Sequence, residues 1–277
     1  MIPFDFDYYK PKTMEEAVTL FSSLKREGKQ PVYYSGGTEI ITLGRLNLLY
    51  TDAVIDIKGI PECRQQYFNS GFLHIGSALS LTEIEETNQF PLLKQTASEV
   101  ADHTSRSKIT LGGNICGNLF YREAILPFLL ADSQIVVADV KGTRTVPINE
   151  LFHEWLQLKN EECLIQLQVE QKYLEAPFVS IKRRKQWDVG YPLITVASLM
   201  VDEEIRVAIS GLCPYPFRSK EMEVFLNQGE LSNEEKINQA ILHVPSPILD
   251  DVEGSADYRL FVLKNTLADI LARLEGA

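Results

Sequence analysis

The sequence predicts an α+β protein in two parts, a larger one over residues 1–172 and a smaller one over residues 173–277. The first observation behind this prediction is that helical and strand patterns alternate along the larger part. The second is a polar segment at 171–177 that ends in proline, which is typical of a domain boundary. The third is that strand patterns precede helical patterns beyond this segment, which favours a small antiparallel sheet with helices on one side.

The larger part begins with a helix and then interleaves strands and helices. Residues 13–16, Thr-Met-Glu-Glu, are typical of a capping box, and residues 80–83, Ser-Leu-Thr-Glu, repeat the signal. Helical spacing of apolar residues marks 14–28, 91–103 and 125–131. Strand patterns occur at 31–34, 53–57, 73–75, 134–140, 145–148 and 163–170, and the alternation at 53–57 predicts a half-buried strand. We expect a subdivision of this part near residue 60.

The smaller part begins with three strand patterns, at 178–182, 193–201 and 204–212. Asp202 and Glu203 join the last two as a hairpin. Helical patterns follow at 219–227, 232–243 and 255–274. The sequence therefore predicts a three-stranded antiparallel sheet with helices on one side.

The composition excludes several classes of protein. The chain has 277 residues, of which 45% are hydrophobic, and a formal net charge of -11. This acidic balance argues against a nucleic-acid binder, which needs clustered Lys and Arg to bind a phosphate backbone. No stretch approaches the roughly 20 apolar residues of a membrane span, and the N-terminus lacks the regions of a signal peptide. We therefore expect no membrane association and a cytoplasmic location.

The cysteines and histidines have no spacing typical of a metal site. The four cysteines lie almost evenly apart with no C-x-x-C pair, and the four histidines form no ligand pattern. They are Cys63, Cys116, Cys163 and Cys213, and His74, His103, His153 and His243. We expect no metal in this chain and nominate no catalytic residue, because no hydrolytic constellation occurs either.

Two glycine pairs carry the strongest functional signal. Gly36-Gly37 follows a predicted strand and precedes a predicted helical turn, which places backbone amides where an anion can bind. An ordinary glycine turn between strand and helix is the alternative interpretation. Neither a G-x-G-x-x-G nor a G-x-x-x-x-G-K-[ST] pattern occurs, so a Rossmann or P-loop site is unsupported.

The second pair, Gly112-Gly113, lies in the segment 110–118, which also contains Gly117 and two asparagines. So many residues that weaken helices and strands predict an irregular backbone, either a plain loop or one that approaches a phosphate. The basic run 182–185 lies at a predicted strand end, where it is either solvated or supplies a cation to a bound dianion. Together the glycine pairs suggest a clamp around a diphosphate cofactor.

Five segments in a fixed order make the chain similar to a known family. They are 34–39, then 106–114, then 182–184 with Asp188, then 211–214 with Arg218, and finally Asp251 with 255–259. In this order they resemble the FAD-binding medium subunits of the molybdenum hydroxylases, which include xanthine dehydrogenase and carbon monoxide dehydrogenase. The resemblance covers the length of the chain.

This resemblance implies a two-part FAD-binding domain of the vanillyl-alcohol-oxidase type, followed by a small C-terminal domain. It implies noncovalent FAD, with the pyrophosphate between the two glycine segments, Leu164 at the adenine end and Lys182 reaching the flavin. The implied cofactor-binding residues are Tyr33, Tyr34, Ser35, Gly36, Gly37, Thr38, Glu39, Ile40, Thr110, Leu111, Gly112, Gly113, Asn114, Glu123, Leu164, Lys182 and Asp188.

The chain departs from the family pattern at three places. Glu123 stands where the family commonly has Asp, which keeps the charge on a longer side chain. The segment 119–122, Leu-Phe-Tyr-Arg, is bulkier than the family's Ala-Ser-Pro and predicts a different loop shape. Val189 stands where some relatives have a Tyr over the flavin, which predicts different stacking there.

The function implied by the resemblance is electron transfer within a complex. FAD would take electrons from iron–sulfur clusters on one partner subunit and pass them to NAD⁺ or another acceptor. Hydroxylation would occur at a molybdenum cofactor on another subunit, with a purine such as xanthine as substrate. Two alternatives stay open, a stand-alone flavin oxidoreductase that binds its substrate between the domains and a scaffold that has lost its cofactor.

Overall fold

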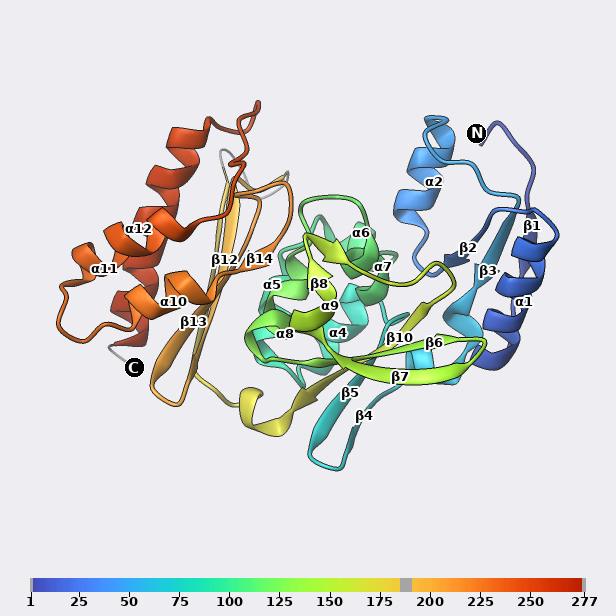
Figure 1. Cartoon of the computed structure of the whole chain (residues 1–277), viewed down its shortest axis with the longest axis horizontal. Coiled ribbons are helices and arrows are strands. Elements are labelled where there is room, and N and C mark those ends of the chain that lie inside the picture. The colour runs from blue at the N-terminus through green and yellow to red at the C-terminus, as the bar shows by residue number, and fades with distance from the viewer. Residues whose placement is uncertain (1, 185–190, 276–277) are drawn as a thin grey trace.

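The computed structural model describes residues 2–184 and 191–275, and it confirms the α+β class. Figure 1 shows three groups of elements along the longest axis of the molecule: an N-terminal group, a central sheet with short helices, and a C-terminal sheet with longer helices. The central group lies between the other two. Its position matters for function, because residues from the N-terminal and central groups together form the candidate site.

The N-terminal group is a parallel sheet in the strand order β1-β3-β2, with two helices. The elements are β1 (Asp7–Tyr9), α1 (Met14–Arg26), β2 (Pro31–Tyr34), α2 (Thr38–Arg45) and β3 (Ala53–Asp56). Thr13 caps α1 as predicted, since its hydroxyl accepts a hydrogen bond from the Glu16 amide at 3.2 Å. The predicted half-buried strand is wrong in one respect: β3 is buried throughout, because it is the central strand and packs into the core that contains α1.

The central group is an antiparallel sheet in the strand order β4-β5-β10-β6-β7. The strands are β4 (Gln66–Asn69), β5 (Phe72–Gly76), β6 (Gln134–Asp139), β7 (Gly142–Pro147) and β10 (Cys163–Glu170), and a small hairpin joins β8 (Phe152–His153) to β9 (Trp155–Leu156). Strand β4 was not predicted. The α-helices are α3 (Pro61–Arg64), α4 (Leu81–Thr87), α5 (Pro91–Ser98), α6 (His103–Arg106), α7 (Leu111–Cys116), α8 (Leu126–Leu130) and α9 (Ile148–Leu151), with 3₁₀ turns η1 (Ile57–Gly59), η2 (Glu123–Ile125) and η3 (Gln171–Tyr173).

Of two helix predictions in the central group, one is confirmed and the other differs from the structure. Ser80 forms the predicted capping box with Glu83 at the start of α4. The helix predicted over 91–103 instead ends at Ser98, because Ala101 has a φ of 46° and Asp102 caps a new helix through the Ser105 amide. A left-handed residue cannot continue a right-handed helix.

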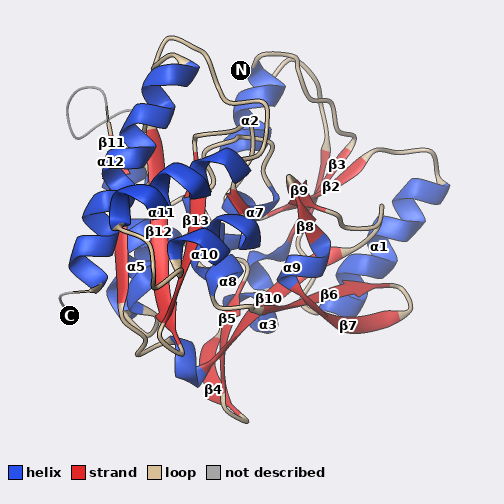
Figure 2. Ribbon diagram, turned by 60° about the vertical axis from the view of Figure 1, so that its left-hand side comes forward, coloured by secondary structure: helices blue, strands red, loops and turns tan. Residues whose placement is uncertain are grey.

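The C-terminal group is an antiparallel sheet of β11 (Phe178–Arg183), β12 (Ile194–Val201), β13 (Glu204–Ser210) and β14 (Phe217–Arg218). The predicted three strands are present, and the two-residue edge strand β14 makes a fourth. Asp202 and Glu203 form the predicted hairpin turn with φ values of 52° and 66°. The helices are α10 (Lys220–Leu226), α11 (Asn233–Ala240) with the turn η4 (Ile241–His243), and α12 (Ala256–Leu274), and Figure 2 shows α10, α11 and α12 in front of this sheet.

Three hydrophobic cores hold these groups together. One face of the C-terminal sheet packs on its own helices, and the other face contributes to the central core through Ala197, Leu199 and Ala208. The boundary between residues 172 and 173 and the subdivision near residue 60 stay predictions. In the described ranges, no helix combines the length and the apolar character that a bilayer crossing requires.

Candidate cofactor site

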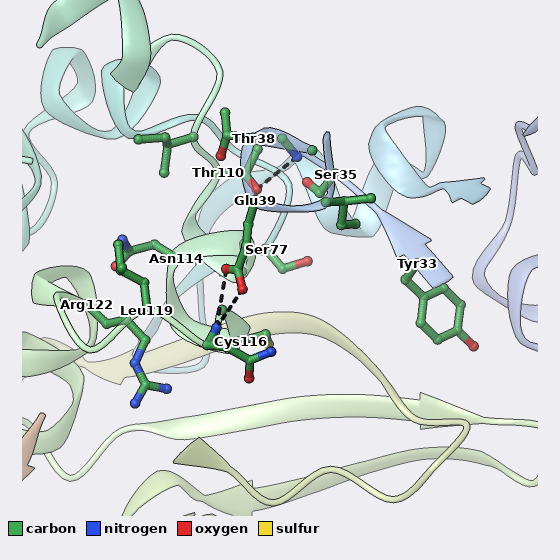
Figure 3. Close-up of a pocket in the computed structure, with 18 of the residues that line it drawn as sticks. Tyr33, Ser35, Thr38, Glu39, Ser77, Thr110, Asn114, Cys116, Leu119 and Arg122 are labelled. Atoms are coloured by element: carbon green, nitrogen blue, oxygen red, sulfur yellow. Dashed lines mark hydrogen bonds between the residues drawn. The ribbon is translucent and has the colours of Figure 1, made fainter. Parts of the chain in front are cut away.

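A cleft of about 670 Å³ lies between α2, α7 and the start of β10 (Figure 3). Small-molecule sites commonly have volumes of roughly 300–1,000 Å³. Most of the residues that the sequence predicts to bind a cofactor line this cleft: Tyr33, Ser35, Gly36, Gly37, Thr38, Glu39, Ile40, Thr110, Gly112, Gly113, Asn114 and Leu164. The fold therefore brings the two glycine segments, more than seventy residues apart in sequence, to one place.

The first glycine pair begins α2 at the wall of the cleft. Gly37 has a φ of 73°, and a Cβ there would lie 2.2 Å from the Tyr34 ring, so only glycine fits this conformation and this contact. Within the described residues no side chain caps the first turn of α2. The N-terminus of α2 thus presents backbone amides and the positive end of the helix dipole toward the cleft, which is the usual way a helix binds an anion.

The second glycine pair forms the helix α7, so the predicted irregular backbone is wrong. Thr110 is its N-cap, and the Thr110 hydroxyl accepts a hydrogen bond from the Gly113 amide at 3.3 Å. The Gly112 amide donates to the Ser77 carbonyl at 2.7 Å, and a Cβ on Gly112 would lie 2.8 Å from the Ser77 Cβ. The glycines therefore let a short helix pack closely on the end of β5. This packing offsets the low helix propensity of glycine.

The two glycine segments are joined directly. The Gly36 amide donates to the Thr110 hydroxyl at 3.3 Å, so this one oxygen accepts from both segments. The first amides of α7 are already bound within the chain, since Leu111 donates to the Leu79 carbonyl at 2.9 Å. Anion-binding amides are therefore expected at α2 rather than at both glycine pairs.

Glu39 carries a negative charge that would repel a diphosphate, but its side chain is held by a contact within the protein. Both of its carboxylate oxygens accept from the Asn118 amide, at 3.0 and 3.2 Å, just beyond the end of α7 (Figure 3). This contact ties α2 to the segment after α7. The carboxylate of Glu39 thereby has a hydrogen-bond donor within the protein.

Aromatic side chains form part of the cleft lining. Tyr33 stacks on Phe21 with 4.5 Å between ring centroids, and its hydroxyl donates to the Glu161 carbonyl at 3.0 Å. Burial raises the pKa of Tyr33, so the phenol stays protonated. Tyr121 and Tyr191, which also line the cleft, stack with 4.9 Å between centroids and an interplanar angle of 18°. The cleft thus offers flat apolar surface beside its polar groups.

Comparison with known proteins decides the family. Residues 4–169 match the family described as the FAD binding domain in molybdopterin dehydrogenase, which is more than half of the chain. The chain belongs to this FAD-binding family. The resemblance inferred from the sequence is therefore confirmed.

Two relatives match this FAD-binding chain over nearly their full length. It is 25% identical over 293 residues to the xanthine dehydrogenase FAD-binding subunit of Escherichia coli O157:H7, covering 99% of this chain and 98% of the relative. It is 24% identical over 301 residues to the nicotinate dehydrogenase FAD-subunit of Eubacterium barkeri, covering 98% of each. A solved structure of carbon monoxide dehydrogenase from Hydrogenophaga pseudoflava, which lacks the Mo-pyranopterin moiety of its cofactor, matches with a TM-score of 0.88 at 22% identity over 98% of each chain.

The residues at the cleft fit the diphosphate of FAD. Ser35 Oγ is buried and has no hydrogen-bond partner among the described residues. A buried hydroxyl without a partner is costly, so a ligand oxygen there satisfies it. The uncapped start of α2 and the Cβ-free surface of the glycines complete a lining that suits a phosphate.

The structure places four other predicted residues of the FAD-binding chain outside the cleft lining. Tyr34 packs beneath Gly37 with Lys58 Nζ 4.4 Å from its ring centroid, and Leu111 is buried in the central core. Lys182 Nζ forms an ion pair with Glu123 at 2.9 Å.

Both partners of this ion pair are buried, with side-chain exposures of 2% for Lys182 and 3% for Glu123. Lys182 Nζ also donates to the Glu99 carbonyl at 2.6 Å. Lys182 is therefore not among the residues that line the cleft, and its contact with the cofactor stays a prediction. Asp188 and Val189 lie outside the described residues.

Sequence reasoning did not nominate Tyr121, Arg122 or Tyr191, which line the cleft. Tyr121 and Arg122 belong to the segment 119–122, which departs from the family pattern. That departure was the sequence signal that could have identified them. Tyr191 stands two positions after Val189, so an aromatic ring is present near the place where the sequence suggested its loss. Among the described residues no group of three His, Cys, Asp or Glu gathers to hold a metal ion.

Proposed function

We propose that this chain is the electron-transfer subunit of a molybdenum-containing hydroxylase and that it holds FAD noncovalently in the cleft between α2 and α7. The observation that carries the proposal is the meeting of both glycine segments in one cleft, with a buried unpaired hydroxyl and an uncapped helix start facing it. These groups are the ones a diphosphate requires.

Each part of the cleft has a role in this proposal. The amides of α2 and the Ser35 hydroxyl bind the pyrophosphate, and Tyr33 and Leu164 pack at the adenine end. Tyr121 and Tyr191 offer stacking surface at the other end and exclude water from it. Bound FAD supplies electron transfer through its isoalloxazine ring. The protein binds and orients it, and no side chain acts as a general acid or base.

The partners and substrate follow from the relatives. We propose an iron–sulfur subunit as electron donor, a molybdenum-cofactor subunit as the site of hydroxylation, NAD as acceptor and the cytoplasm as location. A purine substrate is supported by the relative named as a xanthine dehydrogenase subunit, whose whole length this chain matches. A second relative with nearly equal identity is named for nicotinate, so the substrate is set by the molybdenum-bearing partner.

Titration of the purified chain with FAD tests the cofactor proposal. We expect visible flavin absorption bands that stay with the protein on gel filtration. Ser35→Ala should weaken FAD binding roughly tenfold, because a hydrogen bond to a charged group contributes about 1.5 kcal/mol. Ser133→Ala removes another buried hydroxyl without a described partner, at a residue that does not line the cleft, and should leave the affinity unchanged. A wild-type chain that retains no flavin would overturn the proposal.

Turnover assays separate the subunit proposal from a stand-alone flavin oxidoreductase. The FAD-loaded chain alone should not oxidise xanthine with NAD⁺, because it has no molybdenum centre of its own in the proposal. The complex purified from its native source should do so. Oxidation by the isolated chain at the rate of the complex contradicts the subunit assignment.

A further inference from the structure

The cleft contains one buried cation that no ion pair explains. Arg122 is 3% exposed and is the only Lys or Arg among the described residues that line the cleft. Its backbone amide donates to the Ser210 hydroxyl at 3.3 Å, which fixes the start of η2 against β13. The side chain is therefore held at the cleft by the fold itself.

The guanidinium of Arg122 has only neutral partners. It donates to the Glu154 carbonyl and, at 3.5 Å, to the Ile115 carbonyl, and it lies 5.4 Å from the centroid of the Phe152 ring. Its Nε is buried and has no hydrogen-bond partner among the described residues. Burial lowers the pKa of Arg122 despite the opposing charge of Glu39, yet a guanidinium stays protonated at neutral pH.

The carboxylates at the cleft are committed elsewhere. Glu162 accepts two hydrogen bonds from Arg144, at 2.7 and 2.8 Å, and this pairing holds the pKa of Glu162 below its usual value. Glu39 accepts from the Asn118 amide. Among the described residues Arg122 therefore forms no ion pair, and the charge of Glu39 acts on it without a direct contact. A ligand anion in contact with the guanidinium would stabilise this desolvated positive charge.

We propose that Arg122 is a phosphate-binding residue that balances the charge of the cofactor diphosphate, an assignment that rests on the proposed function. A planar guanidinium with a free Nε–H suits phosphate oxygens, which it can bind through two parallel hydrogen bonds. In Figure 3, Arg122 and Tyr33 lie on opposite sides of the view, with Glu39 and Ser77 between them. Arg122 takes the role of cation that the sequence suggested for Lys182.

Binding of ADP and adenosine to the full chain tests this assignment, because the two probes differ by the diphosphate alone. Their dissociation constants are measured by displacement of FAD from the wild type, Arg122→Met, Arg122→Lys and Arg64→Met. We expect Arg122→Met to weaken ADP about 10- to 100-fold and adenosine less than about twofold. Arg122→Lys keeps the charge and should lie between. Arg64→Met removes an arginine that pairs with Glu83 outside the cleft and should change neither constant.

The outcomes distinguish failure of the Arg122 assignment from failure of the proposed function. Equal weakening of ADP and adenosine by Arg122→Met overturns the assignment, because it means that Arg122 only holds Ile115 and Glu154 in place. Unchanged ADP affinity overturns it as well. A wild-type chain that binds FAD in either of these cases leaves the proposed function standing, whereas a wild-type chain that binds neither FAD nor ADP contradicts both.

Discussion

At Gly36 the first glycine segment touches the backbone that leads into α7. A Cβ at this position would lie 2.2 Å from the Lys108 carbonyl oxygen and 3.1 Å from the Thr110 amide. Backbone atoms cannot swing aside as a flexible side chain does, so the two segments approach only when residue 36 has no side chain. The same approach permits the hydrogen bond from Gly36 to Thr110.

Substitution of Gly36 by Ala should therefore separate the two glycine segments. We expect a loss of about 2–4 kcal/mol in the free energy of unfolding and loss of FAD binding, because overpacking against backbone forces a shift of both segments. Gly229→Ala is the matched control, since a Cβ there meets nothing within 4 Å. Urea unfolding followed by circular dichroism measures the free energy of unfolding of both variants. Equal stability of the two variants would show that the segments are not in contact.

At the scale of elements, the ion pair between Glu123 and Lys182 joins η2 of the central group to β11 of the C-terminal group. Removal of one partner from a buried pair leaves the other charge unpaired, which typically costs about 3–5 kcal/mol. Lys182→Met should therefore destabilise the chain by about 3 kcal/mol even without FAD, and Lys182→Met with Glu123→Leu should recover most of the loss. Lys172→Met breaks an exposed pair with Glu170 and should cost less than about 1 kcal/mol.

This experiment also decides the role that the family resemblance implies for Lys182. If Lys182 contacts FAD, the loss in unfolding free energy should be larger with saturating FAD than without it. If its role is confined to the ion pair, the two losses should agree. Thermal unfolding at a series of FAD concentrations measures the difference.

Elements whose signals are local could be predicted from the sequence, and elements set by distant contacts could not. Ser219, Ser232 and Ser255 cap α10, α11 and α12 where the sequence placed helix starts, because capping depends on residues three positions apart. The helix α7 escaped prediction, since its glycines are stabilised by the carbonyl of Ser77, a residue distant in sequence.

The candidate site divides in the same way. Ser35 and its neighbours could be nominated because a glycine pair after a strand is a short-range signal. The inclusion of Arg122 and Tyr191, and the pairing of Lys182 with Glu123, depend on how segments more than fifty residues apart pack together. No pattern of spacing contains that information.

At the scale of the whole molecule, the central core is completed by the C-terminal sheet. Ala197, Leu199 and Ala208 belong to this core. Arg206 and Arg218 both reach Asp132 just after α8, at 2.6 and 2.8 Å, and donate to carbonyls at the end of α8. The C-terminal group therefore covers apolar surface of the central group and also satisfies the free carbonyls of one of its helices.

A fragment of residues 1–172 should therefore not fold as the full chain does, although the sequence places a boundary there. Without β12 and β13 the fragment exposes the surface around α8 and leaves Asp132 without its two arginines. We expect loss of a cooperative thermal transition and strong binding of a hydrophobic dye. The control is the full chain cut by a protease near residue 175 with both pieces retained, which should unfold close to the intact midpoint. A fragment that unfolds cooperatively and binds FAD would instead support residues 1–172 as an independent domain.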